Sequence, residues 1–389
     1  MKPIKVMSIF GTRPEAIKMA PLLLELQSRP EFDSTTCLTA QHREMLDAVM
    51  ARFGLDAEYD LNIMEPGQTL YTVTAKALFG LGAVLHEAKP DCILVHGDTT
   101  STFTAALAAF YEKIPVGHVE AGLRSGDKYS PYPEELNRKL VGQIADLHFA
   151  PTQRNADNLR KEGITDGVFI TGNTVIDAMR YTLDGFGGKF GTVLDEIDWQ
   201  NRRVITLTCH RRENYGEPME NIFGAVKTLV ERHPDVEVVY PVHPSPAVRE
   251  TAERILGNCP RIHLIAPLDT VEMHALLSKS YFILTDSGGL QEEAPSLGKP
   301  VLVLRTETER PEAIEAGTVR LAGVNRDDIL ALAESLLTDP AVYASMAEAV
   351  NPYGDGYAAK RIADALLWHF GRSADQPASF APQPEDVRP

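Results

Sequence analysis

The stretch that decides the fold is FGTRPEAIKMAP, residues 10–21, which follows a short apolar run. Apolar runs of this length are typical of buried strands, and Gly11 permits a tight turn out of the strand. Thr12 and Glu15 match a capping box, and Pro14 suits the first helical turn because its missing N–H leaves no hydrogen bond unmade there. The stretch therefore predicts a strand that turns directly into a helix, as in parallel α/β sheets.

The same alternation of apolar runs and amphipathic stretches continues along the chain. The strand-like runs lie at residues 6–10, 35–40, 92–96, 116–119, 147–150 and 168–171, and then at 204–209, 236–242, 262–266, 282–285, 301–304 and 319–321. Strands that alternate with helices indicate parallel sheets with helices on both faces. The two series predict an α/β protein of two Rossmann-like, doubly wound domains that face each other across a cleft.

The domain boundary is expected where the alternation breaks, in the irregular residues 185–203. We expect an N-terminal domain over residues 1–184 and a C-terminal domain over residues 185–356, as two domains are usual for a chain of 389 residues. Residues 371–389 are rich in Pro, Ala, Asp and Glu, a composition that predicts a disordered tail.

The composition excludes several classes of function. The net charge is −16 and the isoelectric point about 5.2, so neither nucleic acid nor an anionic membrane is an expected partner. No run reaches the roughly 20 apolar residues of a membrane span. The four cysteines lie far apart in the sequence, which argues against a disulfide framework or a cysteine-ligated metal. We therefore expect a cytoplasmic protein without a bound metal.

Two cations stand near the beginning of the first helix. The positive end of the helix dipole disfavours Arg13 and Lys18 and attracts anions. One interpretation is that both are solvated surface side chains, and the other is that both bind a negatively charged ligand. The acidic net charge favours the second, because an anion must then be held by local cations.

Acidic residues follow two further strand-like runs. Asp98 is either the cap of the next helix or a site residue. Glu120 ends the following run, and a loop rich in Gly, Ser and Pro leads to a helix that carries Glu134 and Arg138. The spacing of four residues allows these two to form a surface ion pair. The density of charges after a strand end instead favours a functional site.

The second half of the chain has glycines and cations at its strand ends. Ser287, Gly288 and Gly289 open a helix, and two glycines let backbone N–H groups approach a phosphate. Glu292, about one turn later, could accept hydrogen bonds from ribose hydroxyls; the alternative is a helix cap and an ordinary surface glutamate. His210, in HRREN, is either a structural histidine or part of an anion site. The eleven histidines show no zinc-binding spacing.

Nine motifs together carry a family resemblance. They are FGTRPEAIKMAPL, TAQHREMLD, HGDTTST, GHVEAGLRSGD, TGNTVIDA, HRREN, TDSGGLQEEAPSLGKPVLVLR, ERPEA and NPYGDG. In this order and spacing, over residues 5–370, the chain resembles the non-hydrolysing UDP-N-acetylglucosamine 2-epimerases of bacteria. The resemblance implies a glycosyltransferase-B-like fold, a homodimer, and interconversion of UDP-GlcNAc and UDP-ManNAc without any cofactor. It also implies that a C-terminal helix, residues 357–370, packs back on the N-terminal domain.

The resemblance assigns roles to the candidate residues. Those implied to bind UDP are Arg13, Ser287, Gly288, Gly289, Glu292 and Arg310. Those implied to be catalytic are Lys18, Asp98, Glu120, Glu134, Arg138 and His210. A second site, at which substrate activates some bacterial members, would use Gln41, His42, Gln68, Arg211 and His243. Gly67 stands where some regulated members carry a basic residue, a departure that argues against such regulation.

The implied chemistry is an elimination followed by an addition. UDP leaves C1 as the C2 proton is removed, giving 2-acetamidoglucal, and UDP then adds back while a proton arrives on the other face. His210 and Arg13 would stabilise the departing UDP, and Asp98, Glu120 and Glu134 are candidates for moving the proton. The assignment of each carboxylate to a face of the sugar stays open.

Other functions remain open at this point. The same fold supports a glycosyltransferase that uses a UDP-sugar donor, and relatives act on UDP-diacetamido sugars. A hydrolysing epimerase and a non-catalytic sugar-nucleotide sensor are further alternatives. The three carboxylates argue against a sensor, because binding of an anionic ligand alone would not favour acids nearby.

Overall fold

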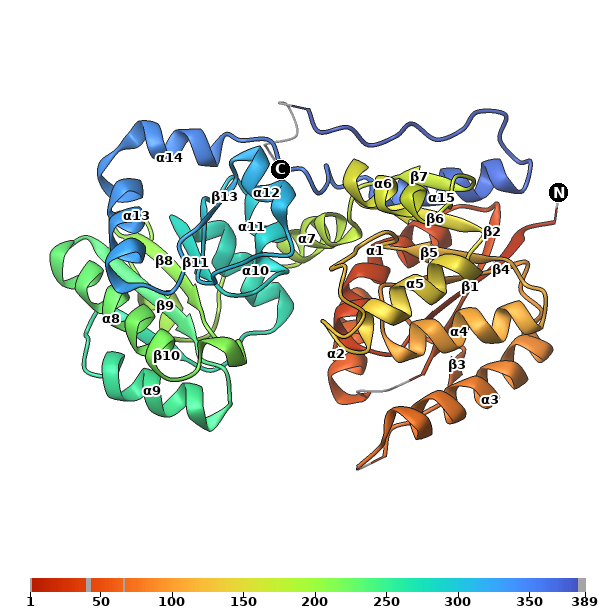
Figure 1. Ribbon diagram of the computed structural model, residues 1–389, viewed down its shortest axis with the longest axis horizontal. Coiled ribbons are helices and arrows are strands. Elements are labelled where there is room, and N and C mark those ends of the chain that lie inside the picture. The colour runs from red at the N-terminus through yellow and green to blue at the C-terminus, as the bar shows by residue number, and fades with distance from the viewer. Residues whose placement is uncertain (1, 40–42, 66, 384–389) are drawn as a thin grey trace. The chain divides into compact units, whose positions relative to one another are not determined.

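The protein, described by a computed structural model over residues 2–39, 43–65 and 67–383, folds into two compact units. The first comprises Met1–Ala178 and Tyr353–Ala381, and the second comprises Met179–Pro352 together with the described residues 382–383. Each unit is built on one parallel sheet (Figure 1). The chain leaves the first unit within α7 (Thr174–Asp184), a few residues before the predicted boundary at 184. The predicted α/β class with two Rossmann-like sheets is confirmed.

The sheet of the first unit has the strand order β3-β2-β1-β4-β5-β6-β7. Its strands are β1 (Ile4–Phe10), β2 (Phe32–Leu38), β3 (Tyr59–Asp60), β4 (Cys92–His96), β5 (Val116–Val119), β6 (Leu147–Ala150) and β7 (Val168–Ile170). The helices besides α7 are α1 (Arg13–Ser28), α2 (Arg43–Phe53), α3 (Leu70–Ala88), α4 (Thr100–Tyr111), α5 (Glu134–Ile144), α6 (Gln153–Lys161) and α15 (Ala358–His369). The sequence analysis missed β3, because two residues are too short to show a pattern.

Alternation along β1 divides the first unit into two apolar layers. Val6 and Phe10 pack on one face of the sheet with α1, α2 and α15, while Met7 and Ile9 pack on the other with α3, α4 and α5. This is the two-residue period of a strand buried on both faces. The short apolar runs of the sequence are therefore central strands of a three-layer unit.

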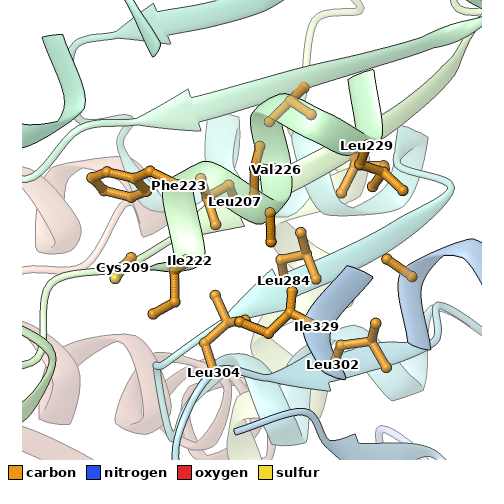
Figure 2. Packing of buried hydrophobic residues seen from close by; sticks show 14 of the residues in the cluster. Leu207, Cys209, Ile222, Phe223, Val226, Leu229, Leu284, Leu302, Leu304 and Ile329 are labelled. Atoms are coloured by element: carbon orange, nitrogen blue, oxygen red, sulfur yellow. The ribbon is translucent and has the colours of Figure 1, made fainter. Parts of the chain in front are cut away.

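The second unit repeats this plan with the strand order β10-β9-β8-β11-β12-β13. Its strands are β8 (Arg203–Thr208), β9 (Val236–Pro241), β10 (Ile262–Ile265), β11 (Phe282–Thr285), β12 (Val301–Val303) and β13 (Val319–Leu321). The α-helices are α8 (Glu217–Arg232), α9 (Pro246–Leu256), α10 (Thr270–Lys279), α11 (Leu290–Ser296), α12 (Pro311–Ala316), α13 (Arg326–Thr338) and α14 (Pro340–Ala347), and short 3₁₀ helices span Val193–Glu196 and Arg212–Asn214. Figure 2 shows Leu207 and Leu284 of the sheet beside Phe223 and Val226 of α8.

The C-terminal helix α15 belongs to the core of the first unit. Ile362 and Leu366 are fully buried in the layer that contains α1 and α2. Asp177 of α7 accepts hydrogen bonds from the backbone N–H groups of Ala358 (3.1 Å) and Ala359 (2.9 Å), at the first turn of α15. Burial raises the pKa of Asp177 to about 7, against which the two N–H groups act.

The chain beyond α15 also makes contacts within the first unit. Phe380 is buried, and its backbone N–H donates to the carbonyl oxygen of Ile170 at 2.7 Å. The Arg361 guanidinium lies 5.4 Å from the centre of the Phe380 ring. The composition of residues 371–389 predicts disorder. In the described residues 371–383, however, the contacts of Phe380 hold the segment against the first unit.

Truncating Leu366 to alanine tests the place of α15 in the core. The loss of a fully buried side chain should lower the free energy of unfolding by about 2–5 kcal/mol. Urea denaturation measures the effect, with Lys360→Ala, an exposed position of the same helix, as the control. Equal denaturation midpoints for L366A and K360A would show that α15 contributes nothing to this core.

Candidate active site

Strand order places the predicted site residues at the topological switch point of each sheet. In the first unit β1 lies between β2 and β4, and in the second β8 lies between β9 and β11. The connections from such neighbouring strands run to opposite sides, which leaves a crevice at their carboxyl ends. Asp98 follows β4, and His210 and Ser287 follow β8 and β11. The sequence predicted this edge of each sheet from strand ends alone.

In the first unit, a buried carboxylate joins the turns that follow β1 and β4. Glu15 Oε2 accepts the backbone N–H groups of Gly11 (2.9 Å) and Thr12 (2.7 Å). Its Oε1 accepts the hydroxyls of Thr99 (2.7 Å) and Thr102 (2.9 Å) at the beginning of α4. Burial raises the pKa of Glu15, and the four donors oppose that rise. The predicted capping box is present and also fixes the neighbouring turn.

Gly11 is required by space in this turn. A Cβ atom at position 11 would lie 1.9 Å from Thr39 Oγ1 and 3.0 Å from Ser101 Oγ. Those two hydroxyls are themselves hydrogen-bonded at 2.9 Å. The turn after β1 therefore packs against the Thr39 and Ser101 hydroxyls, and a side chain at position 11 would collide with them.

Glu120 lies at the end of β5 and pairs with Lys18 of α1. The Lys18 ammonium and Asn173 Nδ2 both donate to Glu120 Oε2, the latter at 2.9 Å. His96 Nε2 lies 3.7 Å from the same oxygen, and His96 is almost fully buried. Glu120 has a φ of 63°, a left-handed conformation that is uncommon for glutamate and is characteristic of functional sites. Lys18 is therefore part of a charge pair at the strand ends.

Asp98 forms the second charge pair of this edge. Arg138 Nε and Nη2 both approach Asp98 Oδ2, at 2.8 and 2.7 Å. Thr99 caps α4, so Asp98 is not the helix cap that the sequence also allowed. The surface ion pair between Glu134 and Arg138, which the spacing also allowed, is not the one that forms. Arg138 pairs with Asp98 and donates to the buried Glu135 at 3.1 Å. Arg138 thus has two acidic partners, Asp98 from the turn after β4 and Glu135 from its own helix α5.

Glu134 and Arg13 lie at helix ends of the same unit. Glu134 is the first residue of α5, and its Oε2 is buried without a hydrogen-bond partner among the described residues. Arg13 is half-buried at the first residue of α1. Both therefore have a polar group at the carboxyl edge of the sheet, as a site for a polar ligand requires.

In the second unit, Asp286 joins the turns that follow β8 and β11. Its Oδ2 accepts the backbone N–H groups of His210 (2.7 Å) and Arg211 (2.8 Å) and the Asn214 amide (3.1 Å). The His210 Nδ1 atom lies 3.3 Å from Asp286 Oδ1. The His210 ring stacks on His243, with centroids 5.5 Å apart and an angle of 13°. Burial lowers the pKa of His210, and Asp286 partly opposes that effect.

The Ser-Gly-Gly turn is flanked by two guanidinium groups. A Cβ atom at Gly288 would lie 3.8 Å from Arg211 Nη2 and 3.9 Å from Arg310 Nη2. Arg310 is held by an ion pair with the buried Glu292. Arg211 Nε is buried and has no hydrogen-bond partner within the described part of the chain. Two cations beside a residue without a side chain provide the space and charge for a phosphate.

Residues predicted for a second site fall in several places. Gln41 and His42 lie outside the described residues. Gln68, which precedes α3, donates its amide to the Ile63 carbonyl. Arg211 and His243 flank His210 in the second unit, as given above. Within that unit the structure brings these two residues to the edge where Ser287 lies.

Three residues of these clusters were not identified from the sequence. His96 and Asn173 contact Glu120, and Asp286 holds the turn of His210. His96 and Asp286 each end or directly follow a strand, beside residues that the sequence analysis did select. Asn173 lies in TGNTVIDA. Position at a strand end was thus the signal that could have found the first two.

Neither a membrane-spanning helix nor a metal-binding cluster occurs in the described part of the chain. Across residues 2–39, 43–65 and 67–383, no helix is long and apolar enough to cross a membrane. Within those same ranges, no group of three or more His, Cys, Asp or Glu side chains is placed to hold a metal ion.

Comparisons with known proteins find relatives that match almost the whole chain. The model of the family described as UDP-N-acetylglucosamine 2-epimerase matches residues 24–367. A UDP-N-acetylglucosamine 2-epimerase of Bacillus subtilis (strain 168) is 57% identical over 98% of this chain and 99% of its own. A structure of S. aureus MnaA with UDP has a TM-score of 0.86 at 51% identity, covering 97% of this chain and 100% of that one.

Two further structures extend the comparison. The Neisseria meningitidis UDP-GlcNAc 2-epimerase bound to UDP-GlcNAc has a TM-score of 0.85 at 50% identity, covering 94% of this chain and 100% of that one. The glycotransferase of kitacinnamycin has a TM-score of 0.60 at 15% identity, over 89% of this chain and 94% of that one. This last likeness concerns the fold alone.

Replacing Glu15 by glutamine tests its role as a bridge between turns. An amide NH₂ cannot accept the hydrogen bonds that one carboxylate oxygen now accepts, so E15Q should lower the free energy of unfolding by about 1–3 kcal/mol. Chemical denaturation measures this. Glu25→Gln, which removes an i,i+4 ion pair with Arg29, is the control and should cost no more than about 0.5 kcal/mol. Equal losses in both variants would contradict the bridging role.

The buried histidines of the first unit predict a loss of stability in acid. Burial lowers the pKa of His96 and His148 to about 4 and that of His118 to about 3. Between pH 6.5 and 4 the unfolded chain binds protons that the folded chain does not. The free energy of unfolding therefore falls with decreasing pH, by up to about 1.4 kcal/mol per pH unit for each histidine.

The variant His118→Gln isolates one of these contributions. His118 Nε2 hydrogen-bonds to the Gly97 carbonyl at 2.7 Å, and a glutamine amide can donate there as well. Denaturation at several pH values should show a slope flatter by up to about 1.4 kcal/mol per pH unit in H118Q. The exposed His86→Gln is the control. A slope unchanged in H118Q would mean that His118 does not remain neutral in the folded protein.

Proposed function

This chain belongs to the UDP-N-acetylglucosamine 2-epimerase family, and from that premise we propose that it interconverts UDP-GlcNAc and UDP-ManNAc without hydrolysis. The observation that carries the proposal is the division of charge between the units. Cations surround Gly288 in the second unit, whereas the first presents Asp98 and Glu120, each beside a cation. An anionic nucleotide and a proton transfer need these two environments.

The second unit is proposed to bind the UDP part of the substrate. Binding of UDP by some part of the chain is supported by relatives, since S. aureus MnaA was solved with UDP and the Neisseria meningitidis enzyme with UDP-GlcNAc. We assign the diphosphate to the turn at Ser287, Gly288 and Gly289, with Arg310 contributing charge. For Arg13 of the first unit, a role in UDP binding is proposed from the family resemblance. Glu292 holds Arg310 in place and is proposed to bind the ribose as well. A diphosphate beside guanidinium groups gains charge-assisted hydrogen bonds.

The reaction is proposed to proceed by elimination and addition. The C1–O bond breaks with its electron pair going to UDP, the C2 proton goes to a carboxylate, and a C1–C2 double bond forms, giving 2-acetamidoglucal. UDP then adds back at C1 while a proton reaches the other face of C2. His210 is assigned to the departing diphosphate, where a positioned cation lowers the barrier. Removal and return of the proton are assigned to Asp98, Glu120 and Glu134.

The cation beside each carboxylate supports these roles. Lys18 and Arg138 compensate the charge of Glu120 and Asp98 whenever these are ionised, so a base can persist at a half-buried site. Glu134 Oε2, buried without a hydrogen-bond partner among the described residues, is the third candidate.

Further features of the family are proposed for this chain. A homodimer is supported by exposed aromatic side chains on neighbouring helices α3 and α4, Tyr71, Phe79, Phe110 and Tyr111. A cytoplasmic location is supported by four free cysteines. The residues that a second nucleotide-sugar site would use are Gln41, His42, Gln68, Arg211 and His243, while Gly67 argues against its regulatory role.

Proton NMR with UDP-GlcNAc in D₂O and no added cofactor tests the reaction. UDP-ManNAc should accumulate, and deuterium should enter C2 of both epimers, because each passage through the glycal exchanges that proton. Free ManNAc with UDP would indicate hydrolysis instead. An unchanged spectrum would refute epimerisation of this substrate, and UDP-diacetamido sugars would then be tried in the same assay.

Two substitutions test the assigned roles. His210→Ala should lower kcat by about 10²–10³-fold, the cost of removing one stabilising donor, with His86→Ala as the exposed control. Glu292→Ala should mainly weaken UDP binding, about tenfold by calorimetry, because Arg310 loses its partner. Glu309→Ala, an exposed neighbour of Arg310, should leave UDP affinity unchanged. Normal turnover by H210A would remove His210 from the leaving-group role.

A further inference from the structure

We propose that Asp286 is a positioning residue for His210, which it holds in one tautomer and whose protonation beside the diphosphate it favours. The inference rests on the proposed function, in which His210 faces the leaving group. Asp286 is not among the residues assigned above to UDP binding or catalysis. The inference does not require it to touch the substrate. Asp286 is wholly buried, directly after β11.

The two oxygens of Asp286 have different partners. Oδ2 receives all three N–H donors, from the backbone of His210 and Arg211 and from the Asn214 side chain. Oδ1 is buried, has no hydrogen-bond partner among the described residues, and lies 3.3 Å from His210 Nδ1. The acceptor left over by the loop therefore faces the imidazole. The buried oxygen would be costly unless the imidazole donates to it.

The distance between Asp286 and His210 is fixed by the sheet. β8 and β11 are paired in parallel, with Thr208 opposite Thr285, and the Asp286 N–H donates to the Thr208 carbonyl at 3.2 Å. Asn214 further ties Asp286 to the Leu304 carbonyl by a second donor at 3.0 Å. These contacts with the central strands fix the position of the Asp286 carboxylate next to His210.

The charges around His210 oppose one another. Burial disfavours its protonated form, and so do His243, which stacks on the ring from the end of β9, and the neighbouring Arg211. Asp286 is the group that favours protonation. Without Asp286 the imidazole would face burial and two basic neighbours alone. Its pKa, already lowered by burial, would then fall further.

The contact also selects a tautomer. A hydrogen on Nδ1 directed at Oδ1 leaves the Nε2 lone pair bare in the neutral ring and adds an Nε2–H donor when the ring is protonated. The ring then donates to the diphosphate as a cation rather than as a neutral group. A charged donor stabilises a developing phosphate anion more strongly than a neutral one.

The test is Asp286→Asn, with the His210 imidazole followed by NMR in the ligand-free protein. The amide oxygen of D286N can keep the two backbone N–H contacts, so the turn persists while the charge is removed. The pKa of His210 should fall by about one unit or more, and the high-pH limb of the kcat profile should move down equally. The control is Glu213→Gln, a carboxylate of the same turn that pairs with Arg305 at 2.7 Å.

Contrary outcomes are distinct from failure of the proposed function. An unchanged His210 pKa in folded D286N would show that Asp286 only holds the turn, and would overturn the inference. The NMR titration needs no substrate, so a wild-type protein that fails to epimerise would refute the function by itself. Should D286N fail to fold, the ¹⁵N shifts of wild-type His210 decide. A neutral ring protonated on Nε2 overturns the inference, and one protonated on Nδ1 supports it.

Discussion

Each unit depends on a buried carboxylate that ties together the turns of its two central strands. Glu15 accepts donors from the turns after β1 and β4, and Asp286 accepts donors from the turn after β8 while it follows β11 itself. Parallel sheets bring these turns together but do not hold their loops in register. A buried acceptor does so, since breaking it would strand several N–H and O–H groups without partners. The functional side chains are placed relative to these two anchors.

In each unit, cations lie close to the strand ends although the chain as a whole is acidic. Cations beside Gly288 create a local environment for an anion, while Lys18 and Arg138 neutralise the carboxylates of the other unit. The net charge of −16 argues against nucleic acid and anionic membranes as partners, but it does not describe the charge around a single turn. The relevant quantity is the field within a few ångströms of each turn.

The sequence predicted what is local, and it failed where distant segments decide. The capping box at Thr12 and Glu15 and the Ser-Gly-Gly turn follow from neighbouring residues, so both were predicted correctly. The partner of Arg138 is Asp98, forty residues away, and spacing along one helix pointed instead to Glu134. Asp286 was missed although it directly follows β11, because the groups that it binds lie after another strand, β8. Its acceptors matter only because β8 lies beside β11.

The left-handed backbone of Glu120 bears on how this protein could be engineered. At a φ of 63° a glycine or asparagine would have less backbone strain than glutamate, and selection for stability alone would favour either. The glutamate persists there at a cost of order 1 kcal/mol, offset by Lys18 and Asn173. Automated stabilisation by backbone preference would therefore erase the side chain proposed to move the proton, and thermostable variants should be designed with this position held constant.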